Sequence, residues 1–172
     1  MSAEDEQKRM AKYMIIGMWV LVVALLTLMF NNILERQQNP NQQLAVQQEG
    51  TGNAVVRLKR NRYGHYVANG LINGQPVTFM LDTGATDVAV PAELADQLGL
   101  QRGRKRFYQT AKGPVTAYAT VLDQVRLGDI KVRHVRASIN PDMHDQEILL
   151  GMSFLKQLEF SQRGDTLTLR QH

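Results

Sequence analysis

Residues 77–86 read Val-Thr-Phe-Met-Leu-Asp-Thr-Gly-Ala-Thr, an apolar run that leads straight into an acid. Such a run predicts a buried β-strand, so Asp82 would stand at the end of that strand. Thr83 and Gly84 favour a tight turn whose hydroxyl and amide groups can hydrogen-bond a carboxylate. By itself Asp-Thr-Gly also fits an ordinary turn after a strand. Residues 148–151, Ile-Leu-Leu-Gly, again place a glycine after apolar residues. The two motifs together are a more specific signal than Asp-Thr-Gly alone.

The sequence on both sides of this stretch predicts one all-β domain over residues 54–172. Short apolar runs alternate with turn-forming Gly, Asn and Asp, and Asn73-Gly74 is a strong hairpin signal between two of them. The predicted strands cover residues 54–59, 65–72, 75–81, 87–90, 107–111, 115–127, 130–138, 149–151, 158–161 and 166–170. Two short helices are predicted at 91–98 and 153–158, the first beginning with a proline and followed by a glycine.

The Asp-Thr-Gly-Ala loop and the later apolar-apolar-Gly motif together resemble the retropepsin-like aspartic proteases of clan AA. The chain is most similar to the bacterial membrane-anchored branch of that clan, which has a single span and one such domain. The resemblance covers nearly all of residues 54–172 and implies one retropepsin-like (half-pepsin) β-barrel. The site residues that it implies are the catalytic Asp82, the active-site loop residues Thr83, Gly84 and Ala85, and, in the second motif beneath that loop, Leu149, Leu150 and Gly151.

The resemblance also implies a hairpin flap over the cleft, encoded between the two motifs. Residues 109–118 are positioned and composed like such a flap, with Gly113-Pro114 at the tip. The flap residues are then Lys112, Gly113 and Pro114. They would close over a peptide bound in extended form. The resemblance implies no cofactor.

A second catalytic carboxylate has to come from a second chain. Two carboxylates held a few ångströms apart cannot both ionise, so one takes a proton from water while the other donates to the peptide carbonyl. The sequence contains one Asp-Thr-Gly, at residues 82–84. We therefore expect a twofold homodimer in which each chain contributes Asp82 to one cleft. By resemblance, Thr83 would hydrogen-bond the partner loop across the axis.

The sequence departs from the retroviral members of the clan at the ion pair that braces their dimer. Those members place an aspartate directly after the alanine and an arginine directly after the second glycine. Here Thr86 follows Ala85, with Asp87 after it, and Met152 follows Gly151. We expect that brace to be absent and the isolated domain to dimerise weakly. A shared membrane anchor would compensate by raising the effective concentration of the two domains.

Residues 13–30 form an uncharged apolar block and predict a transmembrane helix. One alternative is a buried core helix, which would carry polar residues along one face. The other is a cleaved signal peptide, which would end in small residues, whereas Asn31 and Asn32 follow this block. We expect an uncleaved anchor. The Gln- and Asn-rich residues 31–53 are expected to form a flexible linker.

The cations on either side of the block predict its orientation. Lys8, Arg9 and Lys12 precede it, whereas Arg36 is the only Lys or Arg in residues 31–53. The positive-inside rule then places residues 1–12 in the cytoplasm as a tail. We expect a single-pass protein of the cell inner membrane with its protease domain in the periplasm.

Composition excludes several other classes of site. The 172-residue chain has no cysteine, which excludes zinc ribbons, iron–sulfur clusters and thiol nucleophiles. The four histidines have no metal-ligand spacing, so no metal is predicted. The basic cluster at residues 102–106 favours a solvated loop, with anionic lipid head groups or an acidic substrate as alternatives. Nucleic acid is not an expected partner.

The sequence therefore predicts a membrane-anchored aspartic endopeptidase that acts on a peptide or protein substrate as a homodimer. The leading alternative is a catalytically silent module with the retropepsin fold that binds peptides or serves as an adaptor in a membrane complex. A third is a purely structural partner of such a complex. Loss of Asp82 would abolish function only in the first case. The fold alone cannot choose among the three cases, because function depends on the site.

Overall fold

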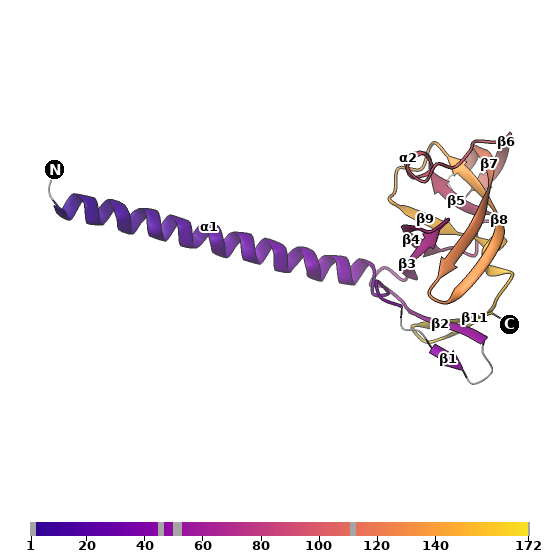
Figure 1. The fold of residues 1–172 in the computed structure, drawn as a ribbon, viewed down its shortest axis with the longest axis horizontal. Coiled ribbons are helices and arrows are strands. Elements are labelled where there is room, and N and C mark those ends of the chain that lie inside the picture. Colours follow the sequence, from indigo (N-terminus) through magenta and orange to yellow (C-terminus); the bar gives the residue numbers. More distant parts are fainter. Residues whose placement is uncertain (1–2, 45–46, 50–52, 111–112, 172) are drawn as a thin grey trace. The chain divides into compact units, whose positions relative to one another are not determined.

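The structure is a computed structural model that describes residues 3–44, 47–49, 53–110 and 113–171 (Figure 1). Its backbone contacts divide the chain into two compact units, with the division between Gln37 and Gln38. The first unit contains the helix α1 (Ala3–Gln38), and the second contains the β-strands and two short helices.

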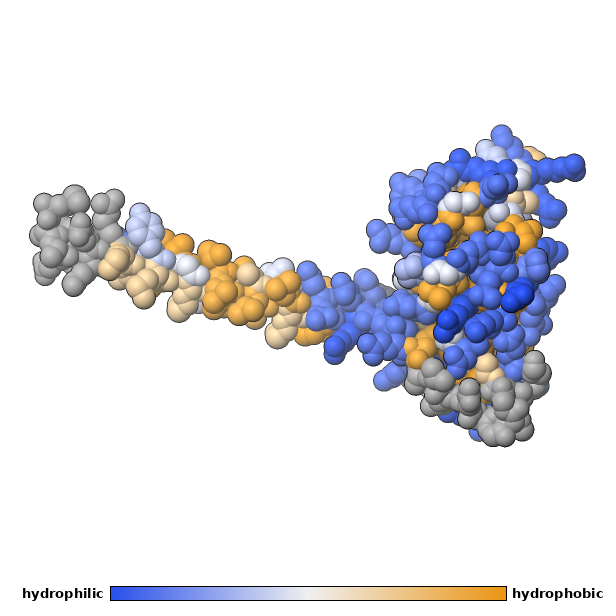
Figure 2. Space-filling model, viewed as in Figure 1, coloured by the Kyte–Doolittle hydropathy of each residue, from blue (hydrophilic) through white to orange (hydrophobic). Residues whose placement is uncertain are grey.

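The helix α1 is long and apolar enough to cross a membrane over Met10–Gln38, and a signal sequence near an N-terminus would meet the same criteria. Apolar side chains gather along the middle of α1 (Figure 2). The apolar block was predicted to end at residue 30, but the helix continues because Glu, Arg and Gln are good helix formers. It ends at Gln38, since Asn39 precedes Pro40 and the residue before a proline disfavours helical backbone.

The second unit is built from eleven described strands. The strands are β1 (Gln47–Glu49), β2 (Asn53–Lys59), β3 (Val67–Ile72), β4 (Gln75–Leu81), β5 (Val88–Pro91), β6 (Lys105–Thr110), β7 (Gly113–Leu127), β8 (Ile130–Asn140), β9 (Glu147–Leu150), β10 (Glu159–Arg163) and β11 (Thr166–Gln171). The two short helices of this unit are α2 (Ala92–Gln97) and α3 (Met152–Leu155). The predicted all-β domain with short helices is confirmed.

Six strands close into a barrel in the order β3-β4-β9-β5-β8-β7, with β3 pairing to β7 and β6 added outside β7. The hairpin between β3 and β4 turns at Asn73 and Gly74, both at positive φ, as predicted from their sequence. Figure 1 shows the long strands β7 and β8 side by side. The barrel encloses a core in which Phe79, Ile148 and Phe154 are fully buried.

A second, antiparallel sheet has the strand order β1-β2-β11-β10. Its strand β1 lies within residues 31–53, which we expected to be a linker. The polar segment Gln-Gln-Glu lacks the alternation of apolar and polar residues that would predict a strand from sequence. It forms a strand because its backbone pairs with β2.

Asn41, from the same Gln- and Asn-rich stretch, is buried against β2 and β3. Its amide donates to the carbonyls of Lys59 (2.9 Å) and Val67 (2.7 Å), and its side-chain oxygen accepts from the Lys59 N–H (2.7 Å). Asn39 adds a hydrogen bond to the Asn69 side chain at 2.8 Å. Residues that follow α1 are therefore part of the second unit rather than a free tether.

Replacing Asn41 with alanine is expected to destabilise the second unit by about 3 kcal/mol, because it leaves the buried Val67 carbonyl and the part-buried N–H and carbonyl of Lys59 without their partner. Amide hydrogen exchange of the full-length protein in detergent, read by mass spectrometry over β2 and β3, would report the change. Gln43→Ala is the matched control, since Gln43 is exposed. Equal protection in the two variants would contradict a structural role for Asn41.

Candidate active site

Asp82 directly follows β4, and its loop is held by backbone hydrogen bonds. The carboxylate oxygen Oδ1 accepts from the Gly84 N–H at 2.8 Å, and the Asp82 N–H donates to the Leu150 carbonyl at 3.2 Å. A further bond joins the Ala85 N–H to the Asp82 carbonyl at 3.3 Å. Asp82 is partly exposed, and Thr83 is exposed. The loop thus presents an oriented carboxylate to solvent.

The second motif lies against this loop. β9 runs parallel to β4 with Leu81 opposite Leu150, and the chain then passes Gly151 into α3. The Met152 N–H donates to the Ala85 carbonyl at 2.8 Å, and the Ser153 N–H donates to the Thr86 carbonyl at 2.9 Å. The two motifs recognised in the sequence are therefore brought together.

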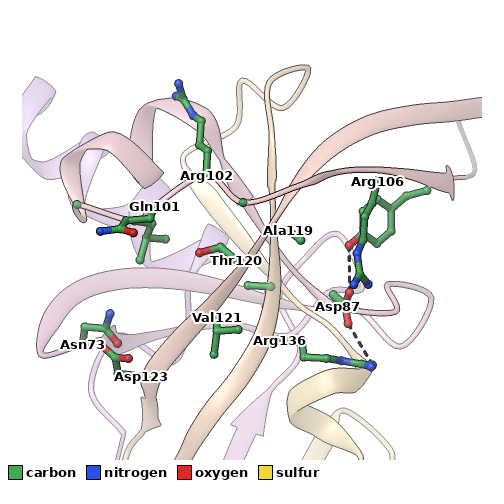
Figure 3. Close-up of a pocket in the computed structure, with 15 residues that line it drawn as sticks. Asn73, Asp87, Gln101, Arg102, Arg106, Ala119, Thr120, Val121, Asp123 and Arg136 are labelled. Atoms are coloured by element: carbon green, nitrogen blue, oxygen red, sulfur yellow. Dashed lines mark hydrogen bonds and ion pairs between the residues drawn. The ribbon is translucent and has the colours of Figure 1, made fainter.

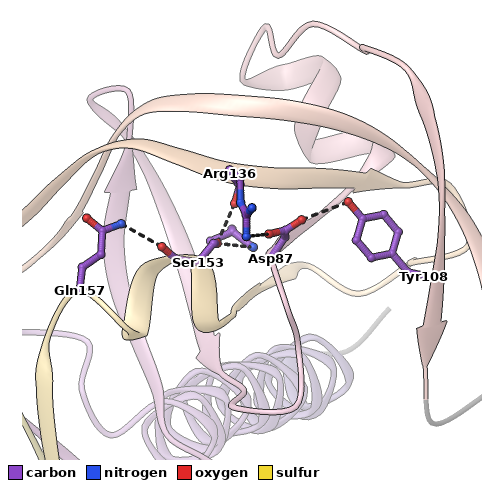
Figure 4. Close-up of polar contacts among 6 residues, drawn as sticks. Asp87, Tyr108, Arg136, Ser153 and Gln157 are labelled. Atoms are coloured by element: carbon purple, nitrogen blue, oxygen red, sulfur yellow. Dashed lines mark hydrogen bonds and ion pairs between the residues drawn. The ribbon is translucent and has the colours of Figure 1, made fainter.

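Asp87 directly precedes β5, and its side chain contacts β6 and β8 (Figure 4). It is 8% exposed and accepts a hydrogen bond from the Tyr108 hydroxyl of β6 at 3.1 Å. Its Oδ1 has no hydrogen bond among the described residues, but Nη2 of Arg136 in β8 lies 3.4 Å away as its ionic partner. This ion pair joins the start of β5 to β8 within one chain.

Ser153, in α3, forms hydrogen bonds to β5 and β8. Its hydroxyl donates to the Arg136 carbonyl at 2.7 Å and accepts from the Val88 N–H at 3.1 Å. The buried hydroxyl therefore fixes the beginning of α3 against β5 and β8. Sequence reasoning missed this contact and the Asp87 contacts, because the partners are far apart in the chain and carry no local motif.

Burial raises the pKa of the Tyr108 hydroxyl above its ordinary value of 10.0, and the negative charge of Asp87 and the hydrogen bond to it act in the same direction. Because the folded state holds this proton more tightly, the stabilisation is fully present below pH 10 and is lost as the pH rises through the raised pKa.

Tyr108→Phe should lower the stability of the domain by about 1 kcal/mol at pH 7, because a hydrogen bond to a carboxylate is lost. The deficit should shrink as the pH rises above 10, because the wild-type hydroxyl loses the proton that it donates to Asp87. Scanning calorimetry at pH 7 and at a pH above 10 would measure the difference in Tm between wild type and variant. Tyr63→Phe is the control, because Tyr63 is exposed. A deficit that grows with alkaline pH would contradict the assignment.

The stretch identified as a flap lies on the β6–β7 hairpin. The two strands pair from Lys105↔Tyr118 to Thr110↔Gly113, so Gly113 and Pro114 are the first residues of β7. Lys112, the remaining flap residue, lies outside the described residues. Phe107 on β6 is 83% exposed.

A pocket of about 660 Å³ lies between this hairpin and the loop that follows α2. Figure 3 shows Asp87 and Arg136 at one end and Asn73 with Asp123 at the other. Its lining includes Arg102 and Arg106 but not Asp82.

The basic cluster at residues 102–106 is partly neutralised. Arg102 binds both carboxylate oxygens of Asp96, at 2.8 and 2.9 Å, so its charge is matched within the domain. Among the described residues, no group of three or more acidic or histidine side chains is arranged to hold a metal ion.

A family model described as gag-polyprotein putative aspartyl protease matches residues 68–157, more than half of the chain. The chain belongs to this family of retropepsin-like aspartic proteases. The matched range contains the Asp82 loop, the β6–β7 hairpin and the second motif. The retropepsin-like fold supports a protease.

Two further proteins and one solved structure are similar to this chain. An uncharacterized protein in the cobV 5′ region of a Sinorhizobium species is 29% identical over 90% of this chain and 72% of its own length. Uncharacterized protein RP867 of Rickettsia prowazekii (strain Madrid E) is 30% identical over 60% of this chain and 46% of its own length. The crystal structure of a retropepsin-like aspartic protease from Rickettsia conorii matches with a TM-score of 0.59 and 29% identity, over 75% of this chain and 96% of that one.

Proposed function

We propose that this protein is a membrane-anchored aspartic endopeptidase that works as a homodimer. The observation that carries the proposal is the loop around Asp82, whose carboxylate is oriented by the Gly84 N–H at the end of β4. One chain supplies one such carboxylate. A pair of them, one from each copy, makes a dyad that can activate water without a metal or cofactor.

The chemistry follows from the unequal protonation of the dyad. The ionised Asp82 takes a proton from water as the water oxygen attacks the carbon of the peptide carbonyl, and the protonated Asp82 donates to the carbonyl oxygen. Breaking the carbon–nitrogen bond of the resulting tetrahedral intermediate then requires a proton on the amine nitrogen, which a carboxyl group of the dyad supplies. The exposed Thr83 would contact the loop of the second copy, and the β6–β7 hairpin would cover the bound peptide.

Anchoring by α1 would confine two copies to the same membrane and favour their association. The distribution of Lys and Arg around the apolar block supports a cytoplasmic N-terminus and a catalytic domain on the periplasmic side. The substrate would then be a peptide or protein that reaches that side of the inner membrane.

The test is cleavage of a diverse peptide mixture by the full-length protein in detergent, from pH 3 to pH 7, with products read by mass spectrometry. Products that depend on Asp82 would support the proposal. A folded, dimeric protein that yields no product at any pH would refute it and favour the peptide-binding alternative.

A further inference from the structure

The end of β2 and the loop that follows it contain a run of cations next to an exposed tyrosine. Residues 57–65 read Arg-Leu-Lys-Arg-Asn-Arg-Tyr-Gly-His, with four Lys or Arg and no acid. Lys59 and Arg62 are exposed, and the Arg62 guanidinium lies 5.0 Å from the centre of the Tyr63 ring. Asp165 pairs with one cation of the run at 3.7 Å. We call residues 57–65 the basic–aromatic loop.

Asn61 fixes the shape of this loop. Its side-chain oxygen accepts hydrogen bonds from the N–H groups of Tyr63 (3.0 Å) and His65 (2.9 Å), and its own N–H donates to the His65 carbonyl at 2.8 Å. Gly64 completes the turn at a φ of +88°. Tyr63 is therefore held on a closed turn, and its side chain is 58% exposed.

The basic–aromatic loop is hydrogen-bonded to the segment that leaves α1. The Asn61 amide donates to the carbonyl of Gln38, the last residue of the helix, at 2.9 Å. Asn41, three residues further along the chain, binds both backbone groups of Lys59. The cations of the loop are thus attached at the point where the chain enters the second unit.

The distance from this attachment to the apolar block of α1 is short. Residues 31–38 separate the two and are helical, so they rise about 12 Å. Head groups extend about 6 Å beyond the hydrocarbon core of a bilayer, and a surface charge acts over a further ~8 Å at physiological ionic strength. Cations attached at Gln38 are therefore within reach of the charge on a membrane that α1 crosses.

We propose that the basic–aromatic loop docks on the head groups of an anionic membrane, with Tyr63 in the interface. Each Lys or Arg near such a surface favours docking by roughly fivefold, and tyrosine is enriched at this depth. The inference rests on the anchoring part of the proposed function and not on its chemistry. Docking would hold the second unit against the membrane surface instead of letting it turn freely about the end of α1.

The single tryptophan of the chain makes the docking measurable. Trp19 lies in α1 and reports the anchor, and Tyr63→Trp in a Trp19→Phe background reports the loop. The full-length proteins would be placed in nanodiscs of phosphatidylcholine and phosphatidylglycerol with a nitroxide quencher on some of the head groups. Docking should bring the tryptophan of the Tyr63→Trp variant into contact with that quencher.

The control is Phe107→Trp in the same Trp19→Phe background. Phe107 is 83% exposed, more than Tyr63, and lies in β6, at the other end of the second unit from β2 (Figure 1). Tyr63→Trp should be quenched severalfold more strongly than Phe107→Trp. Equal quenching at the two positions would overturn the proposal.

Charge reversal tests the role of the anionic lipid. Lys59→Glu should lower the ratio of docked to undocked protein by roughly fivefold or more, and weaken the quenching of Tyr63→Trp accordingly. Arg104→Glu is the matched control, because it reverses an exposed cation of the cluster at residues 102–106. It should leave the quenching unchanged. Equal losses from the two reversals would mean that net charge governs binding rather than this loop, and would overturn the proposal.

The same proteins separate this inference from the proposed function. Quenching of Trp19 by nitroxide on the acyl chains, without head-group quenching of Tyr63→Trp, would keep the anchor and refute the docking. Head-group quenching of Tyr63→Trp in a folded protein that cuts no peptide would keep the docking and refute the endopeptidase. A Trp19 that acyl-chain nitroxide fails to quench would refute the anchor and the docking together.

Discussion

Asp82→Asn is expected to reduce peptide cleavage by roughly 10³-fold or more, because the dyad supplies both the general base and the general acid. Asparagine has nearly the same size, and its side-chain oxygen can still accept the Gly84 N–H, so the loop should stay folded. What it loses is the ability to take a proton from water or to donate one to the carbonyl oxygen. The peptide-mixture assay from pH 3 to pH 7 measures the loss.

The control for this variant is Asp145→Asn, which removes an exposed carboxylate from the loop before β9 and should leave the activity unchanged. An equimolar mixture of wild type and Asp82→Asn tests whether the site is shared. Random pairing would place about half of the wild-type chains in mixed dimers, so the activity per wild-type chain should fall to about half. Unchanged activity in the mixture would mean that each chain acts alone, and full activity of the variant would refute the dyad.

The parts of the fold that were predictable from the sequence are those with a local signal. The apolar run before Asp82 predicted the observed bounds of β4, and Asn73-Gly74 marked the hairpin before it. The Asp82 loop and Gly151 were recognisable because each follows an apolar run. Their contact was expected only through the family resemblance, since nothing in either segment encodes the parallel pairing of β4 with β9.

The missed features depend on contacts between distant residues. Asp87 and Arg136 form their ion pair across two parallel strands, and neither residue stands out from the other charged residues in the sequence. Asn41 looked like one more polar residue of a linker, although its amide completes the hydrogen bonding of two strands. Polar residues in a low-complexity stretch are read as solvated by composition, and only the fold reveals a buried one.

Gly151→Ala is expected to destabilise the domain by about 3 kcal/mol and to remove peptide cleavage with it, because the added methyl has no space. A Cβ at this position would lie 2.3 Å from the Asp87 carbonyl oxygen and 2.6 Å from that of Ala85. Both obstacles are backbone atoms, so no side-chain rotation relieves the overlap. The Ala85 carbonyl also accepts the Met152 N–H, and moving it would shift the loop that carries Asp82.

The backbone conformation of Gly151 makes this a test of packing alone. Its φ of −86° is open to any residue, so alanine adds a steric cost without a conformational one. Gly64→Ala is the opposite control, with φ at +88° and nothing within 4 Å of the added methyl. It should cost about 1 kcal/mol and leave cleavage intact. Hydrogen exchange over β4 and β9, measured beside the peptide assay, would separate the two effects. A Gly151→Ala protein as stable and active as Gly64→Ala would mean that the second motif does not support the Asp82 loop.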